Sequence, residues 1–212
     1  MTPNALFVTG TDTNVGKTLV SAILTLGTKG KYWKPIQTGS DVDRVWIKDA
    51  TKLSDDHFFP ETYKLTQPLS PHAAAEMDGV SIVTSDINLP ARNNGDILIV
   101  EGAGGLLVPL NKHDFMVDLI KKLELPVLLV ARSGLGTINH TLLSLRLIRQ
   151  FGIPLLGVVL NGERNRGNKA AIETYGRVEV LAEIEPLALL DRGTLQDTFN
   201  RKLANFVEDF MK

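Results

Sequence analysis

The most informative absence from this chain of 212 residues is cysteine, of which it has none. Without thiols the chain can form no disulfide bond, no thiolate-bound metal site and no cysteine nucleophile. Any catalysis must therefore use other side chains or a bound cofactor.

The chain also lacks an excess of charge of either sign, with 23 Lys and Arg residues against 24 Asp and Glu residues. Proteins that are drawn to nucleic acid or to an anionic membrane by their overall field carry a clear basic excess. We therefore expect neither nucleic acid nor a membrane among its partners.

Long hydrophobic runs are absent as well, since no stretch approaches the ~20 apolar residues that a membrane-spanning helix requires. The first residues, Met1 to Asn4, carry no basic side chain, and the apolar run that follows covers only residues 5–8. A secretory signal needs a basic start and a longer apolar core. The sequence predicts a cytoplasmic protein.

What the chain does contain is the mixture of a globular protein, with 43% hydrophobic and 22% charged residues. A single domain of this length buries roughly 70% of the surface that its unfolded chain exposes, which is enough for a core. No internal repeat or linker divides the sequence. We expect one domain over residues 1–212.

Short unbroken apolar runs, each bounded by turn residues, occupy residues 5–8, 97–100, 127–131 and 155–160. Continuous hydrophobicity is typical of strands that are buried on both faces. Apolar residues at helical spacing lie between these runs, at residues 19–26 and 142–148. The alternation predicts an α/β fold of the P-loop NTPase type, a mostly parallel sheet with helices on both faces.

Residues 40–95 interrupt this alternation. They hold an expected helix around residues 42–53 and then polar, proline-bearing sequence. An insertion of this size over a sheet often carries substrate specificity. We expect it near the substrate site.

The C-terminal residues 195–210 carry an apolar stripe at helical spacing, formed by Leu195, Phe199, Leu203, Phe206 and Phe210. Such a stripe can bind a membrane surface, but the opposite face would then concentrate Lys and Arg. Here that face mixes acidic and basic residues. We interpret the stripe as core packing.

Residues 10–18 read GTDTNVGKT and lie between an expected buried strand and a helix, which is the context of a phosphate-binding P-loop. Backbone N–H groups of such a loop point at phosphate oxygens, helped by the helix N-terminus. Lys17 is expected to reach the β- and γ-phosphates, and the Thr18 hydroxyl to bind Mg²⁺. Because the loop is one residue longer than usual, Thr11 takes the place of the first glycine. A chance Gly-Lys-Thr is the alternative, and the strand–loop–helix context disfavours it.

A P-loop offers Mg²⁺ only one side chain, so an acidic ligand is expected from another strand end. Glu101 follows the apolar run at residues 97–100, at the sheet edge where α/β folds place ligands. Gly102 and Gly104 permit close approach of a ligand to the backbone. We interpret Glu101 as a metal ligand rather than a simple strand-end acid. Lys34, after a short expected strand at residues 31–33, carries no such signal by itself.

Together, several segments resemble dethiobiotin synthetase. They are the P-loop with its extra residue (residues 7–18), KPIQTG at residues 34–39, SPH at 70–72, VEGAGG at 100–105 and LGTINH at 135–140. The resemblance runs, with gaps, from residue 5 to residue 161.

The resemblance implies an ATP-dependent ligase of biotin biosynthesis. Such an enzyme carboxylates 7,8-diaminopelargonic acid with CO₂ and closes the ring to give dethiobiotin, ADP and phosphate. One substrate amine first becomes a carbamate, whose oxygen attacks the γ-phosphate. The second amine then displaces phosphate from the carbamic-phosphoric anhydride.

The resemblance also implies roles for individual residues, with Lys34, Lys17 and Thr11 as the catalytic ones. Mg²⁺ is the implied cofactor, ATP is the co-substrate, and Thr18, Asp49 and Glu101 are the implied metal ligands. Asn161 is expected to read the adenine edge, with Pro186 flanking the base. The implied nucleotide-binding residues are Asn14, Val15, Gly16, Lys17, Thr18, Leu19, Asp49, Glu101, Gly102, Ala103, Gly104, Asn161 and Pro186.

The diamine substrate is expected to contact a further set of residues. They are Thr11, Lys34, Thr38, Gly136, Thr137, Ile138 and Asn139. The last four are expected to come from the other subunit of a homodimer, where a helix start favours the substrate carboxylate.

Three other classes share a P-loop. Switch ATPases of the partitioning or cell-division type often carry a second lysine early in the loop, and residues 11–15 have none. A small P-loop kinase or GTPase is the second class. A GTPase should carry Asn-Lys-x-Asp after a late strand, whereas NKHD at residues 111–114 follows the Glu101 loop. The cobalamin-pathway amide-forming synthetases need a glutaminase domain with a cysteine nucleophile, which this chain lacks.

Overall fold

The computed structural model describes residues 4–212. Part of the interpretation of the N-terminus concerns Met1, Thr2 and Pro3, which lie outside the described residues. The strands are β1 (Ala5–Gly10), β2 (Lys31–Trp33), β3 (Ile36–Thr38), β4 (Tyr63–Leu65), β5 (Leu98–Gly105), β6 (Val127–Arg132), β7 (Leu155–Asn161) and β8 (Val180–Ile184). The helices are α1 (Lys17–Thr28), α2 (Asp43–Thr51), α3 (Pro71–Met77), α4 (Met116–Leu123), α5 (Thr137–Gln150), α6 (Arg166–Gly176), α7 (Arg192–Lys202) and α8 (Ala204–Phe210). Short 3-10 turns occupy Asp55–His57 and Thr84–Asp86.

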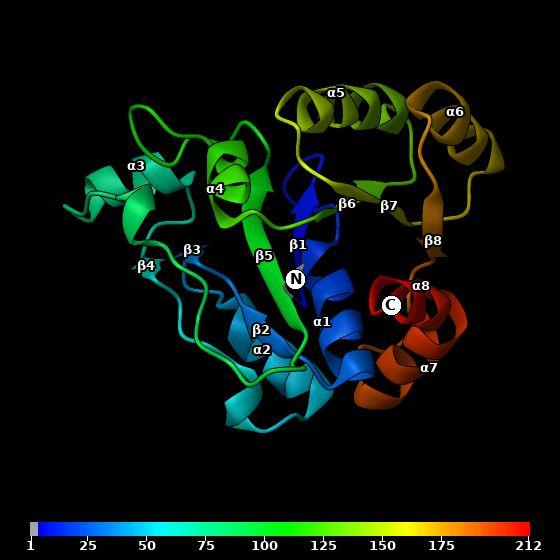
Figure 1. Ribbon diagram of the computed structural model, residues 1–212, viewed down its shortest axis with the longest axis horizontal. Coiled ribbons are helices and arrows are strands. Elements are labelled where there is room, and N and C mark those ends of the chain that lie inside the picture. Colours follow the sequence, from blue (N-terminus) through cyan, green and yellow to red (C-terminus); the bar gives the residue numbers. More distant parts are fainter. Residues whose placement is uncertain (1–3) are drawn as a thin grey trace.

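Six strands form one parallel sheet in the order β2-β5-β1-β6-β7-β8, and β3 pairs with β4 in a small second sheet. Figure 1 shows α5 and α6 on one side of the large sheet and α1, α7 and α8 on the other. The predicted fold class is confirmed.

The strands are buried on both faces because their alternate residues enter two different cores. In β1, Phe7 packs into the core under α4, α5 and α6, while Leu6 and Val8 pack into the core under α1, α7 and α8. The four apolar runs of the sequence all lie in strands of this sheet. A one-residue slip of β1 would exchange the two sets of side chains, so both cores fix the register.

The strand order places the P-loop at the centre of the sheet. β1 lies between β5 and β6, and the chain leaves it through the loop that leads into α1. Parallel strands have their carboxyl ends at one edge, and ligands of such sheets bind where the strand order reverses. The residues that follow β1, β2 and β5 therefore meet at one place.

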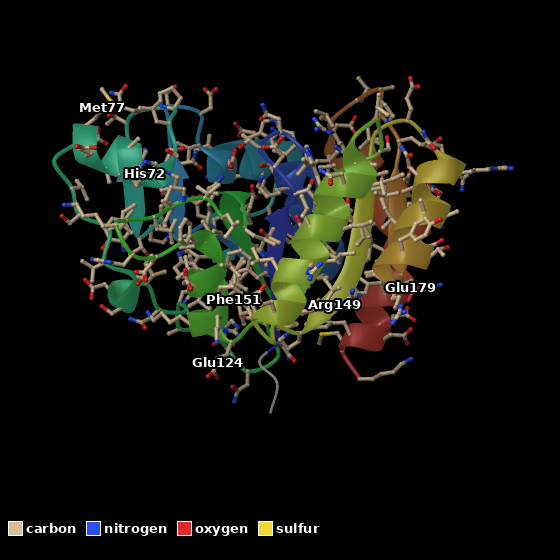
Figure 2. All side chains as sticks on the ribbon, turned by 90° about the horizontal axis from the view of Figure 1, so that it is seen from above. His72, Met77, Glu124, Arg149, Phe151 and Glu179 are labelled. Atoms are coloured by element: carbon tan, nitrogen blue, oxygen red, sulfur yellow. The ribbon has the colours of Figure 1, made fainter. Side chains whose placement is uncertain are left out.

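The expected interruption at residues 40–95 contains α2, β4, α3 and the two 3-10 turns. Figure 2 shows His72 and Met77 at one end of the molecule and Glu179 at the opposite end. Part of this segment is fixed to α4 by Lys122, whose ammonium donates to the carbonyl oxygens of Thr84, Ser85 and Ile87 at 2.7, 2.8 and 2.6 Å. The helix expected at residues 42–53 is present as α2.

The C-terminal stripe packs into the core, as interpreted from the sequence. Leu195 and Leu203 are fully buried beneath α1, together with Phe199. A Cβ atom added to Gly27 of α1 would lie 2.0 Å from the Phe199 ring, so α7 can approach α1 this closely only because residue 27 is glycine. Among the helices of residues 4–212, none is long and apolar enough to cross a membrane.

The packing of the stripe gives a stability prediction. Leu195→Ala should lower the free energy of unfolding by about 2–5 kcal/mol, because it opens a cavity in the core. Leu189, which is 63% exposed, provides the matched control, and Leu189→Ala should change stability by less than about 0.5 kcal/mol. Urea denaturation followed by circular dichroism measures both values. Equal, small effects would contradict the core assignment of α7.

Candidate functional site

The P-loop makes two tight approaches that require glycine. Gly16 has a φ of 101°, and a Cβ atom there would lie 2.2 Å from Asn161 Nδ2. A Cβ atom on Gly10 would lie 2.7 Å from Val15 Cγ2. Larger residues at these positions would push the loop away from the sheet, so the glycines keep its backbone in the turn that precedes α1.

Lys17 begins α1 and points back over the loop. Its Nζ donates to the carbonyl oxygen of Asp12 at 2.9 Å. Burial lowers the pKa of Lys17 to about 8, against the opposing attraction of Glu101. The Lys17 ammonium group is therefore partly desolvated and held against the Asp12 carbonyl oxygen.

Glu101 lies in β5 and is 1% exposed. Thr18 Oγ1 donates to its Oε1 at 2.8 Å, and the Tyr32 hydroxyl donates to its Oε2 at 3.0 Å. Lys34 Nζ lies 3.7 Å from Oε1. Burial, and then the charge of Glu101, raises the pKa of Tyr32 well above its usual range, so the hydroxyl remains a donor.

Lys34 forms an ion pair with Asp43, the first residue of α2. Burial lowers the pKa of Lys34, but the charges of Glu101 and Asp43 outweigh it and the pKa is raised overall. Lys34 therefore stays an ammonium group although it is only 7% exposed. Gln37 fixes the approach of α2, since its Oε1 accepts from the Asp43 N–H at 3.2 Å and its Nε2 donates to the Asp41 carbonyl oxygen at 3.0 Å.

These groups line one cavity of about 770 Å³. Its wall combines the P-loop and α1 with β3, β5 and the segments after β2 and β3. Ser70 and Pro71, at the start of α3, close it from the side of residues 40–95. Of the residues predicted from the sequence, those that line the cavity are Asn14, Gly16, Lys17, Thr18, Lys34, Thr38, Glu101, Ala103 and Gly104.

Other predicted residues lie beside this cavity. Leu19 lines a small adjoining hollow with Trp46 and Leu190, and Thr11 lines a separate hollow against α5. Asn161, at the end of β7, donates from Nδ2 to the carbonyl oxygen of Val15 at 3.0 Å. It is therefore attached to the back of the P-loop, and its predicted contact with adenine stays a prediction.

A third group of predicted residues lies away from the cavity. Gly102 packs against Phe7, and Pro186 is exposed after β8. The residues from Gly136 to Asn139 form the start of α5 and are not among those that line the cavity. They were expected to act on the site of the other subunit, which a single chain does not test.

The structure places Asp49, which was predicted as a metal ligand and nucleotide contact, outside the cavity, and those roles stay predictions. Asp49 is exposed on α2 and does not line the cavity, whereas Asp43 of the same helix does. Six residues separate the two carboxylates, which at ~3.6 residues per turn places them on different sides of the helix. Asp43 therefore takes the position that was assigned to Asp49.

The helical spacing of α2 contained the signal for Asp43. Ile47 and Ala50 are buried, and Asp43 precedes Ile47 by four residues, so it shares their face. Asp49 does not fit that spacing. Tyr32 and Gln37 were also missed, and for them the sequence has no comparable signal, because their contacts join segments that are far apart or irregular.

The NKHD segment has a structural role that does not involve the cavity. Asn111 Oδ1 accepts from the N–H groups of His113 and Asp114 at 2.8 Å each, and Asn111 Nδ2 donates to the Ile82 carbonyl oxygen at 3.0 Å. These bonds build a turn between β5 and α4. The turn is not among the segments that line the cavity, so the guanine-binding alternative has no support from it.

The oxygen atoms of Thr18, Asp43 and Glu101 are the kind of ligand that Mg²⁺ prefers. Within residues 4–212, no group of three or more His, Cys, Asp or Glu side chains could hold a metal by itself. This fits Mg²⁺, which is usually bound by one or two carboxylates together with water and substrate phosphates. The donor set therefore suits a magnesium–nucleotide complex.

Comparisons with known proteins agree with a nucleotide site. A family model described as "AAA domain" matches residues 4–194. The ATP-dependent dethiobiotin synthetase BioD of Paramagnetospirillum magneticum is 48% identical over 190 residues, which are 90% of this chain and 92% of that protein. The protein of the same name from Nitrobacter hamburgensis is 42% identical over 209 residues, covering 98% of this chain and 97% of its own length.

A solved structure shares the fold at much lower identity. The septum site-determining protein MinD of Pyrococcus horikoshii, complexed with Mg-ADP, has a TM-score of 0.53 and 16% identity. The match covers 93% of this chain and 86% of that chain. Similarity at this level supports the fold alone.

Paired substitutions on α2 test which of the two carboxylates acts at the cavity. Asp43→Asn removes a negative charge from the cavity, and we expect it to reduce by about tenfold the gain in affinity that Mg²⁺ gives a non-hydrolysable ATP analogue. Asp49→Asn makes the same change on the exposed side and should alter that gain by less than about twofold. Isothermal titration calorimetry with Mg²⁺ and with EDTA gives both ratios. Loss of the gain in Asp49→Asn alone would restore the assignment of Asp49.

Proposed function

The chain belongs to the dethiobiotin synthetase family of ATP-dependent ligases, and on that premise we propose that it carboxylates 7,8-diaminopelargonic acid with CO₂ and closes the cyclic urea of dethiobiotin. The observation that carries the proposal is the pair of buried lysines. Lys17 and Lys34 line one cavity and come from separate segments, so that one can hold ATP while the other faces a second substrate.

The P-loop is proposed to hold the triphosphate. Its backbone N–H groups and the start of α1 provide a positive end for phosphate oxygens. Lys17 would exchange its contact with the Asp12 carbonyl oxygen for contacts with the β- and γ-phosphates. Asn161 would contribute to the adenine site from the end of β7.

Thr18, Asp43 and Glu101 are proposed to hold Mg²⁺ beside the phosphates. The ion would neutralise charge on the phosphates while the γ-phosphoryl group is transferred. Asp43 is paired with Lys34 in this structure. If Asp43 turns to the metal, the Lys34 ammonium becomes available to the anionic substrate groups in the same cavity.

Lys34 and Thr38 are proposed to bind the carbamate. An ammonium group acts as a point charge that suits a small anion, and the low exposure of Lys34 strengthens that attraction. Thr11, which was predicted to assist from the P-loop, lines the neighbouring hollow. We propose that it contacts the diamine where the two hollows approach each other.

The proposed reaction has three steps. A substrate amine forms a C–N bond with CO₂ and loses a proton, which gives a carbamate. The carbamate oxygen attacks the γ-phosphorus atom, and ADP leaves with the electrons of the broken P–O bond. The second amine then attacks the carbamoyl carbon, phosphate leaves, and the ring closes. Lys17 and Lys34 stabilise the charge on the transferring group, a form of stabilisation that acts strongly in a dry site.

A homodimer is proposed to complete the substrate site. The start of α5, from Gly136 to Asn139, would offer N–H groups of the first helical turn to the substrate carboxylate of the other subunit. Leu135 and Leu143, which are exposed on the same side, would be covered in that arrangement. We also propose that residues 1–212 act as one domain, in which residues 40–95 shape the substrate end of the cavity.

Phosphate release from Mg-ATP tests the proposed function. With bicarbonate present, we expect release to depend on 7,8-diaminopelargonic acid and a cyclic urea to appear by mass spectrometry. The reason is that the γ-phosphoryl acceptor, the carbamate, forms only on the diamine. Slow release that ignores the diamine would favour a switch ATPase instead.

Lys34→Ala tests the division of labour between the two lysines. We expect kcat to fall by about 10²–10³-fold, while the Kd of a non-hydrolysable ATP analogue changes by less than about threefold. Lys31 lies three residues earlier, on β2, and is paired with Asp56 outside the cavity, so Lys31→Ala is the control and should leave both values near those of the wild type. If Lys34→Ala lowers the affinity for the ATP analogue as much as it lowers kcat, Lys34 has no role separate from nucleotide binding.

A further inference from the structure

Tyr32 is the central residue of β2, and its side chain is 0% exposed. Tyrosine hydroxyls that are buried usually find a hydrogen-bond partner, often a backbone carbonyl. Here the partner is the Oε2 atom of Glu101, at 3.0 Å. A core residue thus contacts a carboxylate of the candidate site.

The strand register explains how Tyr32 reaches Glu101. Tyr32 is paired with Ile99 of β5, and Glu101 follows Ile99 by two residues on the same face of the sheet. A strand spacing of ~4.8 Å and a rise of ~3.3 Å per residue place such neighbours about 8 Å apart, a distance that an aromatic side chain can span. Trp33 points to the opposite core, so it cannot substitute for Tyr32.

The two oxygens of Glu101 have different surroundings. Oε2 receives the Tyr32 hydroxyl, whereas Oε1 receives Thr18 Oγ1 at 2.8 Å and lies 3.7 Å from Lys34 Nζ. The last torsion of a glutamate side chain is broad, so packing alone defines it weakly. A hydroxyl that is fixed beside Glu101 Oε2 therefore also determines the direction in which Oε1 points.

Both the ring and the backbone of Tyr32 are fixed by contacts with residues 58 and 59. Its ring meets Phe58 edge to face, with ring centres 6.3 Å apart and an angle of 63° between the rings. Its carbonyl oxygen accepts from the Phe59 N–H at 2.9 Å. The hydroxyl therefore has little freedom to leave Glu101.

We propose that Tyr32 is a positioning residue, which holds Glu101 Oε2 so that Oε1 is presented to Mg²⁺ beside Thr18. The inference rests on the proposed function, because it requires Glu101 to bind the metal. Tyr32 acts through Glu101 and is not among the residues that line the cavity.

Tyr32→Phe removes the hydroxyl and keeps the ring. The readout is the Kd of a non-hydrolysable ATP analogue in EDTA divided by its Kd in Mg²⁺, measured by calorimetry. We expect this ratio to fall by about tenfold, the usual loss when a group that orients a metal ligand is removed. The Kd in EDTA should stay unchanged, because the P-loop contacts are intact. The matched control is Tyr63→Phe. Among the hydrogen bonds of residues 4–212, the Tyr63 hydroxyl only accepts from the Val83 N–H, at 3.0 Å.

A double-mutant cycle with Glu101→Gln tests the role of Tyr32 separately from the proposed metal-binding role of Glu101. If Tyr32 acts through Glu101, Tyr32→Phe should have no further effect on the ratio in the Glu101→Gln background. A normal ratio in Tyr32→Phe with a reduced one in Glu101→Gln would overturn the role of Tyr32 only. Normal ratios in both variants would overturn the metal role of Glu101 as well. Equal loss of affinity with and without Mg²⁺ would show that Tyr32 is merely structural. Circular dichroism of Tyr32→Phe checks that the variant is folded, which we expect because the ring that packs against Phe58 is kept.

Discussion

A carboxylate stays charged inside a protein only where donors surround it, since taking it out of water costs several kcal/mol. The Glu101 carboxylate depends on donors from separate parts of the chain, namely Thr18 on α1, Tyr32 on β2 and Lys34 after β2. Satisfying this one group brings the P-loop helix and the edge strand to the end of β5. The candidate site thus forms where these donors converge on one buried carboxyl group.

The same architecture serves proteins with different activities, because a parallel sheet with a P-loop provides only a phosphate site. What distinguishes this chain lies around that site. The segment after β2 brings a second buried ammonium group, and residues 40–95 add Asp43 and the start of α3 to the cavity wall. A switch ATPase needs a surface that changes with its nucleotide, whereas a ligase needs room for a second substrate, and the cavity of about 770 Å³ is lined by Lys34 and Thr38 as well as by the P-loop.

The sequence predicted the parts of the fold that depend on local pattern. Continuous apolar runs located β1, β5, β6 and β7, because strands covered on both faces leave no polar alternation. β8 was missed, since its VLAEI sequence includes Glu183, a buried acid that is tolerated beside Arg164. The P-loop and Glu101 were likewise local signals. To choose Asp43 rather than Asp49, one must know which face of α2 is turned to the cavity. The contact between Tyr32 and Glu101 depends on the pairing of two strands that are distant in the sequence, which no local pattern encodes.

The Asn161 side chain has two structural roles beside the P-loop. It ends β7, supports the Val15 carbonyl oxygen and fills the space that a side chain on residue 16 would need. A larger residue at position 161 would press on the phosphate loop, and a smaller one would leave a carbonyl without its donor. Position 161 therefore has little freedom in the size of its side chain.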